Sequence, residues 1–234
     1  ITAKIPADAK VGDHTVVFRN TKGKKIGRLM VHIGARAEGS TARKGFSSAD
    51  FIYLLTPDRF RNGDPSNDCV KGLLEAPDRE FQGGRHGGDL AGVIASLDYF
   101  KNLGVSSLWL NPVLENDMPS YSYHGYAMTD LYAVDERYGS NALYKELADK
   151  AKEKGIGLIM DQVANHIGSS HPWMADLPSK DWVNQWPEFT QTNHMKVSRF
   201  DPHAAEVDRK QFTDGWFVET MPDLNQRNEK LARY

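Results

Sequence analysis

The first 45 residues alternate between apolar and polar side chains with a period of two. Residues 15–18 and 29–33 show this alternation, and residues 20–23 (Asn-Thr-Lys-Gly) have the composition of a turn. The pattern predicts paired β-strands. Because two or three strands cannot form a stable core alone, we expect residues 1–45 to be the last strands of a larger β module, ending in a linker at residues 39–45.

From residue 51 onwards the pattern changes to apolar runs of strand length, at residues 51–55, 107–110 and 156–160. Between the runs, apolar residues recur at helical spacing, at Leu90, Val93, Ile94, Leu97 and Phe100, and again at Leu143, Leu147, Ala148 and Ala151. Helix signals bound each pattern, with Asp89 and Ser140 as N-caps and Gly104 and Gly155 as C-terminal stops.

Strand, helix, strand, helix, strand is the order of parallel β/α units. The helices are short, and the connections that follow the strands are long. This favours the beginning of a (β/α)8 barrel enzyme over a doubly wound sheet. Residues 167–222 are rich in aromatic side chains and show neither helical periodicity nor a repeat, so we expect an inserted subdomain there.

Composition removes several classes of function. The net charge is −2 and the basic residues are scattered, which argues against a nucleic-acid surface or an anionic membrane surface. There is no apolar run of about 18 residues that could span a bilayer. The single cysteine, Cys69, excludes an internal disulfide framework and a cysteine metal site.

The loop after the first apolar run concentrates oxygen-bearing side chains. Hard cations such as calcium take six to eight oxygen ligands. A candidate set comprises Asn62, Asp64, Asn67, Asp68, Gly87 (through its carbonyl) and Asp89. The alternative is that these residues serve only as turn formers, and local spacing leaves both interpretations open.

Two further loops carry candidate chemistry. Tyr121, His124 and Tyr126 cluster after the second run, where aromatic rings suit the apolar face of a sugar or simply the packing of a long loop. Asp161, with Asn165 and His166 four and five residues later, follows the third run. In parallel α/β proteins this end of a strand collects ligand-handling side chains. A structural alternative is an aspartate that caps the strand end and a histidine satisfied by a neighbour.

In this order the motifs resemble glycoside hydrolase family 13, the α-amylase family. Residues 161–166 (Asp-Gln-Val-Ala-Asn-His) match its first signature region, and residues 124–126 (His-Gly-Tyr) match the loop whose tyrosine stacks on the sugar before the scissile bond. Residues 221–225 (Met-Pro-Asp-Leu-Asn) are similar to the neopullulanase and cyclomaltodextrinase branch. The resemblance covers residues 46–234 and implies the first three units of a TIM barrel with an insert at about 167–222.

The resemblance also implies roles. Tyr126 would be the stacking platform, with His124 and His166 as neighbouring sugar contacts. Asp161 would orient a catalytic-site arginine, and Asn165 would brace the junction of barrel and insert. The six oxygen-bearing residues match a calcium site of several branches. The branch carries an immunoglobulin-like N-terminal module, which fits residues 1–45 as its tail and makes a homodimer a candidate assembly.

The retaining mechanism of this family uses three carboxylates. The resemblance implies that all three lie on later strands, and no acidic residue of the chain matches them. We therefore expect the N-terminal part of an α-glucan hydrolase that cleaves α-1,4 links, with α-1,6 links as a second candidate. Alone, the 234 residues should be inactive without the remainder of the barrel. The alternative is a non-catalytic amylase-like barrel that serves glycan binding or assembly. A periplasmic or extracellular location is favoured over a cytoplasmic one.

Overall fold

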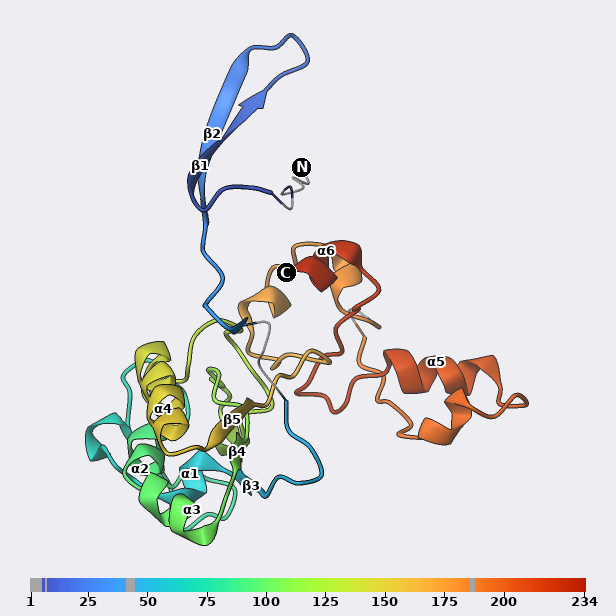
Figure 1. Cartoon of the computed structure of the whole chain (residues 1–234). Coiled ribbons are helices and arrows are strands. Elements are labelled where there is room, and N and C mark those ends of the chain that lie inside the picture. The colour runs from blue at the N-terminus through green and yellow to red at the C-terminus, as the bar shows by residue number, and fades with distance from the viewer. Residues whose placement is uncertain (1–5, 7, 41–44, 186–187) are drawn as a thin grey trace. The chain divides into compact units, whose positions relative to one another are not determined.

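The computed structural model describes residue 6 and residues 8–40, 45–185 and 188–234. The chain divides into two compact units, Ile1–Ser47 and Ser48–Tyr234 (Figure 1). No helix in the described part of the chain is long and apolar enough to cross a membrane. The linker expected at residues 39–45 falls largely on residues 41–44, which lie outside the described residues.

The first unit contains an antiparallel hairpin, which confirms the predicted strands. Strand β1 (Gly12–Arg19) pairs with β2 (Lys25–Ile33). The side-chain oxygen of Asn20 accepts hydrogen bonds from the backbone N–H groups of Lys22 and Lys24, which closes the turn between the strands.

The second unit is built on a three-stranded parallel sheet in the order β3-β4-β5 (Figure 1). The strands are β3 (Ile52–Leu55), β4 (Ser107–Leu110) and β5 (Gly157–Met160), and they coincide with the three apolar runs. The prediction of parallel β/α units is therefore confirmed. The register aligns the last residues of the strands, so the loops that follow β3, β4 and β5 leave the sheet at one edge.

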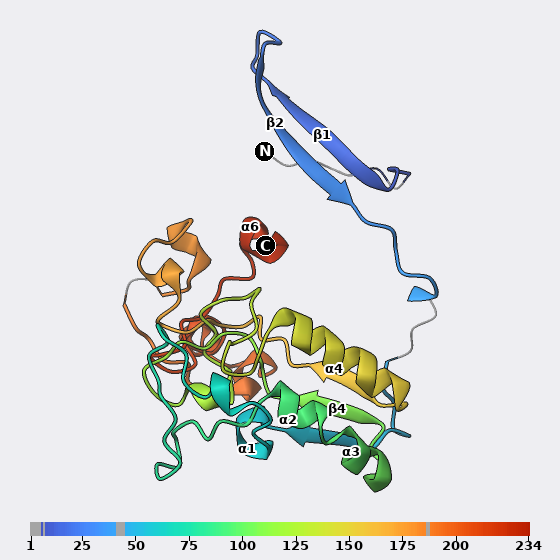
Figure 2. The same ribbon diagram turned by 90° about the vertical axis from the view of Figure 1, so that its left-hand side faces the viewer.

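Three helices run beside these strands (Figure 2): α2 (Leu90–Ile94), α3 (Leu97–Leu103) and α4 (Asn141–Glu153). Asp89 and Ser140 cap α2 and α4 as predicted, by accepting a backbone N–H three residues later. The prediction of one continuous helix between Asp89 and Gly104 is wrong, because the helix breaks at Ala95 and Ser96, although it ends at Gly104 as expected. The hydroxyl of Ser96 donates to the carbonyl of Gly92, which competes with the regular helical ladder.

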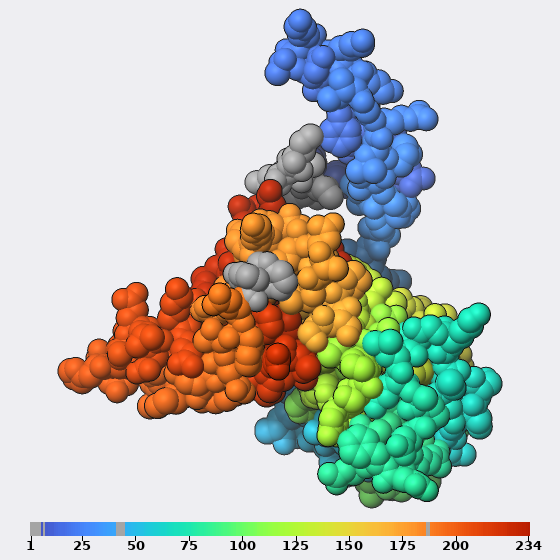
Figure 3. All heavy atoms as spheres, turned by 180° about the vertical axis from the view of Figure 1, so that it is seen from behind, coloured from blue at the N-terminus to red at the C-terminus, as the bar shows by residue number. Residues whose placement is uncertain are grey.

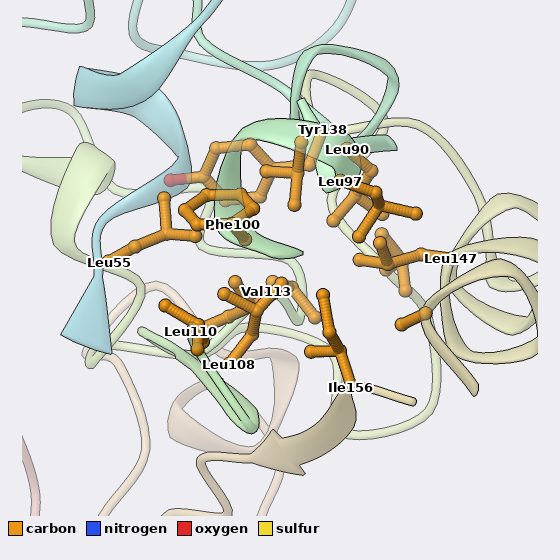
Figure 4. Packing of buried hydrophobic residues seen from close by; sticks show 14 residues of the cluster. Leu55, Leu90, Leu97, Phe100, Leu108, Leu110, Val113, Tyr138, Leu147 and Ile156 are labelled. Atoms are coloured by element: carbon orange, nitrogen blue, oxygen red, sulfur yellow. The ribbon is translucent and has the colours of Figure 1, made fainter. Parts of the chain in front are cut away.

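The main core lies between the strands and these helices. Figure 4 shows Leu108 and Leu110 of β4 pointing toward Phe100 and Leu147, and all four side chains are buried. Trp109, between the two leucines, points to the other face of the sheet and remains 38% exposed. The helices therefore cover only one face of β4.

The segment after β5 has a second apolar cluster of its own, formed by Ile167, Trp182, Val183, Trp216, Leu224 and Leu231. Our expectation that residues 167–222 contain no helix is wrong, because α5 spans Glu206–Asp214. None of its residues is buried, so the sequence has no apolar stripe that would reveal the helical period. The remaining helices are short: α1 (Pro57–Phe60), α6 (Glu229–Arg233), and 3-10 turns at Pro65–Asn67, Ser122–His124, Pro172–Met174, Lys180–Trp182 and Lys196–Arg199.

Candidate functional site

A cavity of about 880 Å³ lies where the loop after β4 meets the segment after β5. Its size is near the upper end of the range for small-molecule sites, about 300–1,000 Å³. Figure 3 shows the two contributing regions in contact, with yellow-green atoms against orange and red ones. The cavity is lined by Met118, Pro119, Ser120, Tyr121, His124, Tyr126, Ala127, Gln162, Val163, Ala164, Asn165, His166, Phe217, Val218, Thr220 and Met221.

Tyr126 is fixed beside the sheet by the carboxylate of Asp161. Its hydroxyl donates to Oδ2 of Asp161 at 2.9 Å, and the indole N–H of Trp109 donates to the same oxygen at 3.0 Å. Burial, followed by the hydrogen bond to Asp161, raises the pKa of Tyr126 to about 12. The phenol therefore keeps its proton at neutral pH. Trp109 of β4 pairs with Ile159 of β5, and Asp161 follows Ile159 by two residues. Because side chains alternate along a strand, Trp109 and Asp161 lie on the same face of the sheet.

Two histidines hold the backbone of Tyr126. The N–H of Tyr126 donates to Nδ1 of His124 at 2.9 Å, and the carbonyl of Tyr126 accepts from Nε2 of His166 at 2.9 Å. The side-chain amide of Asn165 donates to Nδ1 of His166 at 3.1 Å. Burial lowers the pKa of both His124 and His166, so both rings are neutral at pH 7.

The structure thus brings Tyr126, His124, His166 and Asn165 to one cavity, while Asp161 supports it from the strand end. A family model described as "Alpha amylase, catalytic domain" matches residues 51–234. The chain belongs to the α-amylase family.

Curated relatives agree with this assignment. The chain is 34% identical over 200 residues to a cyclomaltodextrinase of Thermoanaerobacter pseudethanolicus. The matched region covers 81% of this chain and 31% of that protein. It is 33% identical over 184 residues to Neopullulanase 2 of Thermoactinomyces vulgaris, covering 78% of this chain and 30% of that protein. The chain therefore spans less than a third of the length of either relative.

A solved structure of an Anoxybacillus α-amylase has the same arrangement, with a TM-score of 0.65 and 33% sequence identity. The match covers 79% of this chain and 36% of that one.

The third α-amylase motif of the chain, residues 221–225, lies against the first. The backbone N–H of Ile167 donates to the carbonyl of Pro222, and that of Leu224 donates to the carbonyl of Asn165. Asp223, between them, is buried and accepts a hydrogen bond from the side chain of Asn184 at 2.8 Å. Burial raises the pKa of Asp223 to about 6. This pairing joins the strand-end segment to the region expected to form the insert.

The candidate calcium loop follows β3 and is separate from the cavity. The amide nitrogen of Asn62 donates to Oδ1 of Asp68 at 2.7 Å. Gly87 has a φ of +83°, and a Cβ on it would come within 2.5 Å of the same Asp68 oxygen. The side-chain oxygens of Asn62 and Asn67 are buried and have no hydrogen-bond partner among the described residues. Unpaired buried acceptors of this kind are suited to a hard cation.

The other two residues of the predicted set are engaged differently. The carboxylate of Asp89 accepts backbone N–H groups from Gly63, Asp64 and Gly92. The side chain of Asp64 is exposed and accepts from the backbone and hydroxyl of Ser66, which lower its pKa. Across the described residues, no group of three or more His, Cys, Asp or Glu side chains is placed to hold a metal ion. A cation here would therefore depend on amide and carbonyl oxygens in addition to the carboxylate of Asp68.

Sequence reasoning missed two residues of the site. Trp109 donates a hydrogen bond to Asp161. The alternation of side chains along β4 could have indicated this residue, because it places Trp109 on the face of the sheet opposite the core. Phe217 lines the cavity and stacks on the ring of His166 with centroids 5.8 Å apart. Nothing in the local sequence marks Phe217, because a fold of about 50 residues brings it to His166.

Proposed function

We propose that the protein containing this chain is an α-glucan hydrolase of the neopullulanase and cyclomaltodextrinase branch. The observation that carries the proposal is the cavity in which residues from all three motifs meet: Tyr126, His166 and Met221. Relatives named cyclomaltodextrinase and neopullulanase support the class of substrate. The bonds cleaved are α-1,4 links, with α-1,6 links as the second candidate.

Within this proposal, the half-buried ring of Tyr126 stacks on the sugar next to the scissile bond. The ring is held in place because its hydroxyl is bound to Asp161 and its backbone to His124 and His166. His124 supplies the adjacent polar contact. His166 has protein partners on both ring nitrogens, so a direct bond to a sugar hydroxyl requires one of them to be exchanged.

Asp161 has the role of orienting an arginine. Both described hydrogen bonds to its carboxylate fall on Oδ2, and we assign Oδ1 to the arginine. The three reacting carboxylates and this arginine are supplied outside residues 1–234, by later strands of a (β/α)8 barrel that begins with β3, β4 and β5. The exposed side chains of Leu54 and Trp109, which lie on the face of the sheet opposite the helices, then face the interior of that barrel.

The proposal is tested by incubating the full-length protein with maltooligosaccharides, cyclodextrins and pullulan and following the release of reducing ends. We expect turnover of at least one substrate with retention of the anomeric configuration. The 234-residue chain alone should show none. Binding of oligosaccharides without turnover by the full-length protein would contradict hydrolysis and favour the non-catalytic alternative.

We also propose calcium as the resident cation, held by the oxygens of Asn62, Asn67 and Asp68 and the carbonyl of Gly87, with Asp64 and Asp89 as further members of the set. Bound calcium would tie the loop after β3 to the start of α2. At a hundredfold excess over its Kd, it would stabilise the protein by about 2.7 kcal/mol.

The measurement is the melting temperature with a chelator and after addition of calcium. Asp68→Asn should reduce the calcium-dependent rise, while Asp98→Asn, an exposed aspartate on α3, should not. An unchanged melting temperature after chelation would remove the calcium proposal.

The hairpin β1–β2 is proposed as the end of an immunoglobulin-like module, through which the full-length protein forms a homodimer. Light scattering of the full-length protein and of a variant lacking the module tests this. A monomeric full-length protein would refute it. We place the protein in the periplasm or outside the cell, which fractionation of the source cells would check.

A further inference from the structure

Arg85, in the segment between β3 and α2, places a charged side chain in the interior of the protein. The residue is only 1% exposed. Its Nε lies 3.9 Å from Oδ1 of the buried Asp58, and its Nη1 donates to the hydroxyl of Ser122 at 3.1 Å. Its Nη2 is buried and has no hydrogen-bond partner within the described part of the chain. A buried ion pair is often no more stabilising than apolar side chains of similar volume, and an unpaired nitrogen adds a further cost. Stability alone therefore does not account for an arginine at this position.

The guanidinium of Arg85 reaches the 3-10 turn that carries His124 by two routes. The first is the hydrogen bond to Ser122, whose side chain is fully buried. In the second, Cζ of Arg85 lies 4.7 Å from the ring centroid of Tyr138, and the hydroxyl of Tyr138 donates to the carbonyl of Tyr123 at 2.7 Å. Both residues that precede His124 are therefore fixed through one guanidinium.

The carboxylate of Asp58 holds this arrangement from the side of β3. It accepts the backbone N–H groups of the two residues that follow Arg85, at 2.9 and 3.2 Å, which fixes the backbone beside the guanidinium. The same carboxylate accepts a hydrogen bond from Arg59, whose Cζ lies 3.8 Å from the ring centroid of Tyr123. One buried carboxylate thus orients two arginines, and each of them contacts the turn from outside the cavity.

We propose that Arg85, anchored by Asp58, is a positioning residue for the sugar contacts of the cavity. It is not among the residues that line the cavity, so it acts through the turn. The turn sets the place of His124, whose Nδ1 accepts the backbone N–H of Tyr126. Displacement of the turn would therefore move His124 and Tyr126 together. The inference rests on the proposed function and adds a residue to it that touches no substrate.

The test uses the full-length protein and the variant Arg85→Lys. Lysine keeps the positive charge but lacks the planar fork that reaches Asp58 and Ser122 together. KM and kcat are measured on maltoheptaose, and Kd is measured by calorimetry on a sulfur-linked maltooligosaccharide that is not cleaved. KM and Kd should each rise about tenfold while kcat changes less than about threefold, because contacts present in both the bound substrate and the transition state are weakened.

Two further variants separate positioning from folding, and the melting temperature of each protein is measured so that all assays run well below it. Ser122→Ala removes the acceptor of Arg85 and should raise KM and Kd in the same direction by a smaller factor. The double variant should be no weaker than Arg85→Lys alone, because both substitutions break one interaction. Leu147→Ala is the matched control, since it opens the main core on α4 and should lower the melting temperature while KM and Kd stay at wild-type values.

Wild-type KM and Kd in Arg85→Lys would overturn the proposal, and Ser122→Ala decides in the same way if Arg85→Lys does not fold. Additive effects of the two substitutions, or an equal rise of KM and Kd in Leu147→Ala, would also overturn it. A wild-type protein that binds the oligosaccharides without cleaving them contradicts hydrolysis, yet the Kd values still decide the role of Arg85. A wild-type protein that binds no oligosaccharide overturns the proposed function together with this inference.

Discussion

Replacing Asp89 tests which of two roles this carboxylate has. The sequence offered it both as the N-cap of the helix and as a calcium ligand. In the structure its two oxygens accept three backbone N–H groups, from Gly92 at 2.6 Å, Asp64 at 2.7 Å and Gly63 at 3.1 Å. The side chain is fully buried. Asp89 therefore clamps the loop after β3 onto the first turn of α2.

These three hydrogen bonds give an estimate of how much Asp89→Ala lowers the free energy of unfolding. Loss of the helix cap at Gly92 costs about 1 kcal/mol. The N–H groups of Gly63 and Asp64 belong to exposed residues that water can reach, so each adds about 0.5–1.5 kcal/mol. The total is about 2–4 kcal/mol, which corresponds to a melting temperature lower by roughly 5–15 °C for a cooperative unit of about 150–250 residues.

The assay is thermal unfolding of the full-length protein in calcium and in chelator. If Asp89 acts through the backbone bonds, Asp89→Ala lowers the melting temperature by the same amount in both conditions. Asp98→Asn is the control, because Asp98 is exposed and its ion pair with Lys154 lies at the surface, so this substitution should leave the melting temperature nearly unchanged in both conditions. A loss seen only with calcium would refute the reasoning and make Asp89 a ligand first.

Three other substitutions have defined outcomes. Trp109→Phe removes one of the two donors to Asp161 that the described residues supply. A bond to a carboxylate contributes about 1.5–3 kcal/mol, so kcat/KM of the full-length protein on maltooligosaccharides should fall roughly ten- to a hundredfold. Unchanged kinetics would exclude this role of Trp109. The fold raises the pKa of Asp223 from 3.8 to about 6, so the folded protein holds this proton more tightly than the unfolded chain does. The free energy of unfolding therefore falls as the pH rises from about 4 to 6. Asp223→Asn should remove this dependence and raise the melting temperature at pH 7.5, with at most about 3 kcal/mol involved; a lower melting temperature would count against it. Gly125 has a φ of +80°, and Gly125→Ala would place a Cβ 2.0 Å from the carbonyl oxygen of Pro112. This substitution should abolish oligosaccharide binding and lower the melting temperature. Wild-type values of both would show that the loop can adapt.

The elements that the sequence predicted correctly are those whose signals are local. The strands β3, β4 and β5 are short apolar runs, and the caps Asp89 and Ser140 bond to N–H groups three residues away. Hydrophobic burial and capping act within a few residues, so the pattern contains them.

The features that were missed depend on distant partners or on exposed surface. The break between α2 and α3 is set by Ser96, whose hydroxyl also meets the guanidinium of Arg61, 35 residues earlier. Helix α5 buries nothing, so hydrophobic periodicity could not reveal it. The pairing of Trp109 with Asp161 needs the strand register, which the sequence does not contain.

The two hydrogen bonds to the backbone of Tyr126 determine where the protons of the site reside. The backbone N–H of Tyr126 can only donate, so Nδ1 of His124 must be the unprotonated acceptor. The proton of this neutral ring is therefore on Nε2. A carbonyl can only accept, so His166 also carries its proton on Nε2, while its Nδ1 receives the amide of Asn165. His124 can therefore offer a ligand an N–H and nothing else. A hydroxyl or ether oxygen can bind to that N–H, whereas an ammonium group finds no acceptor on either imidazole.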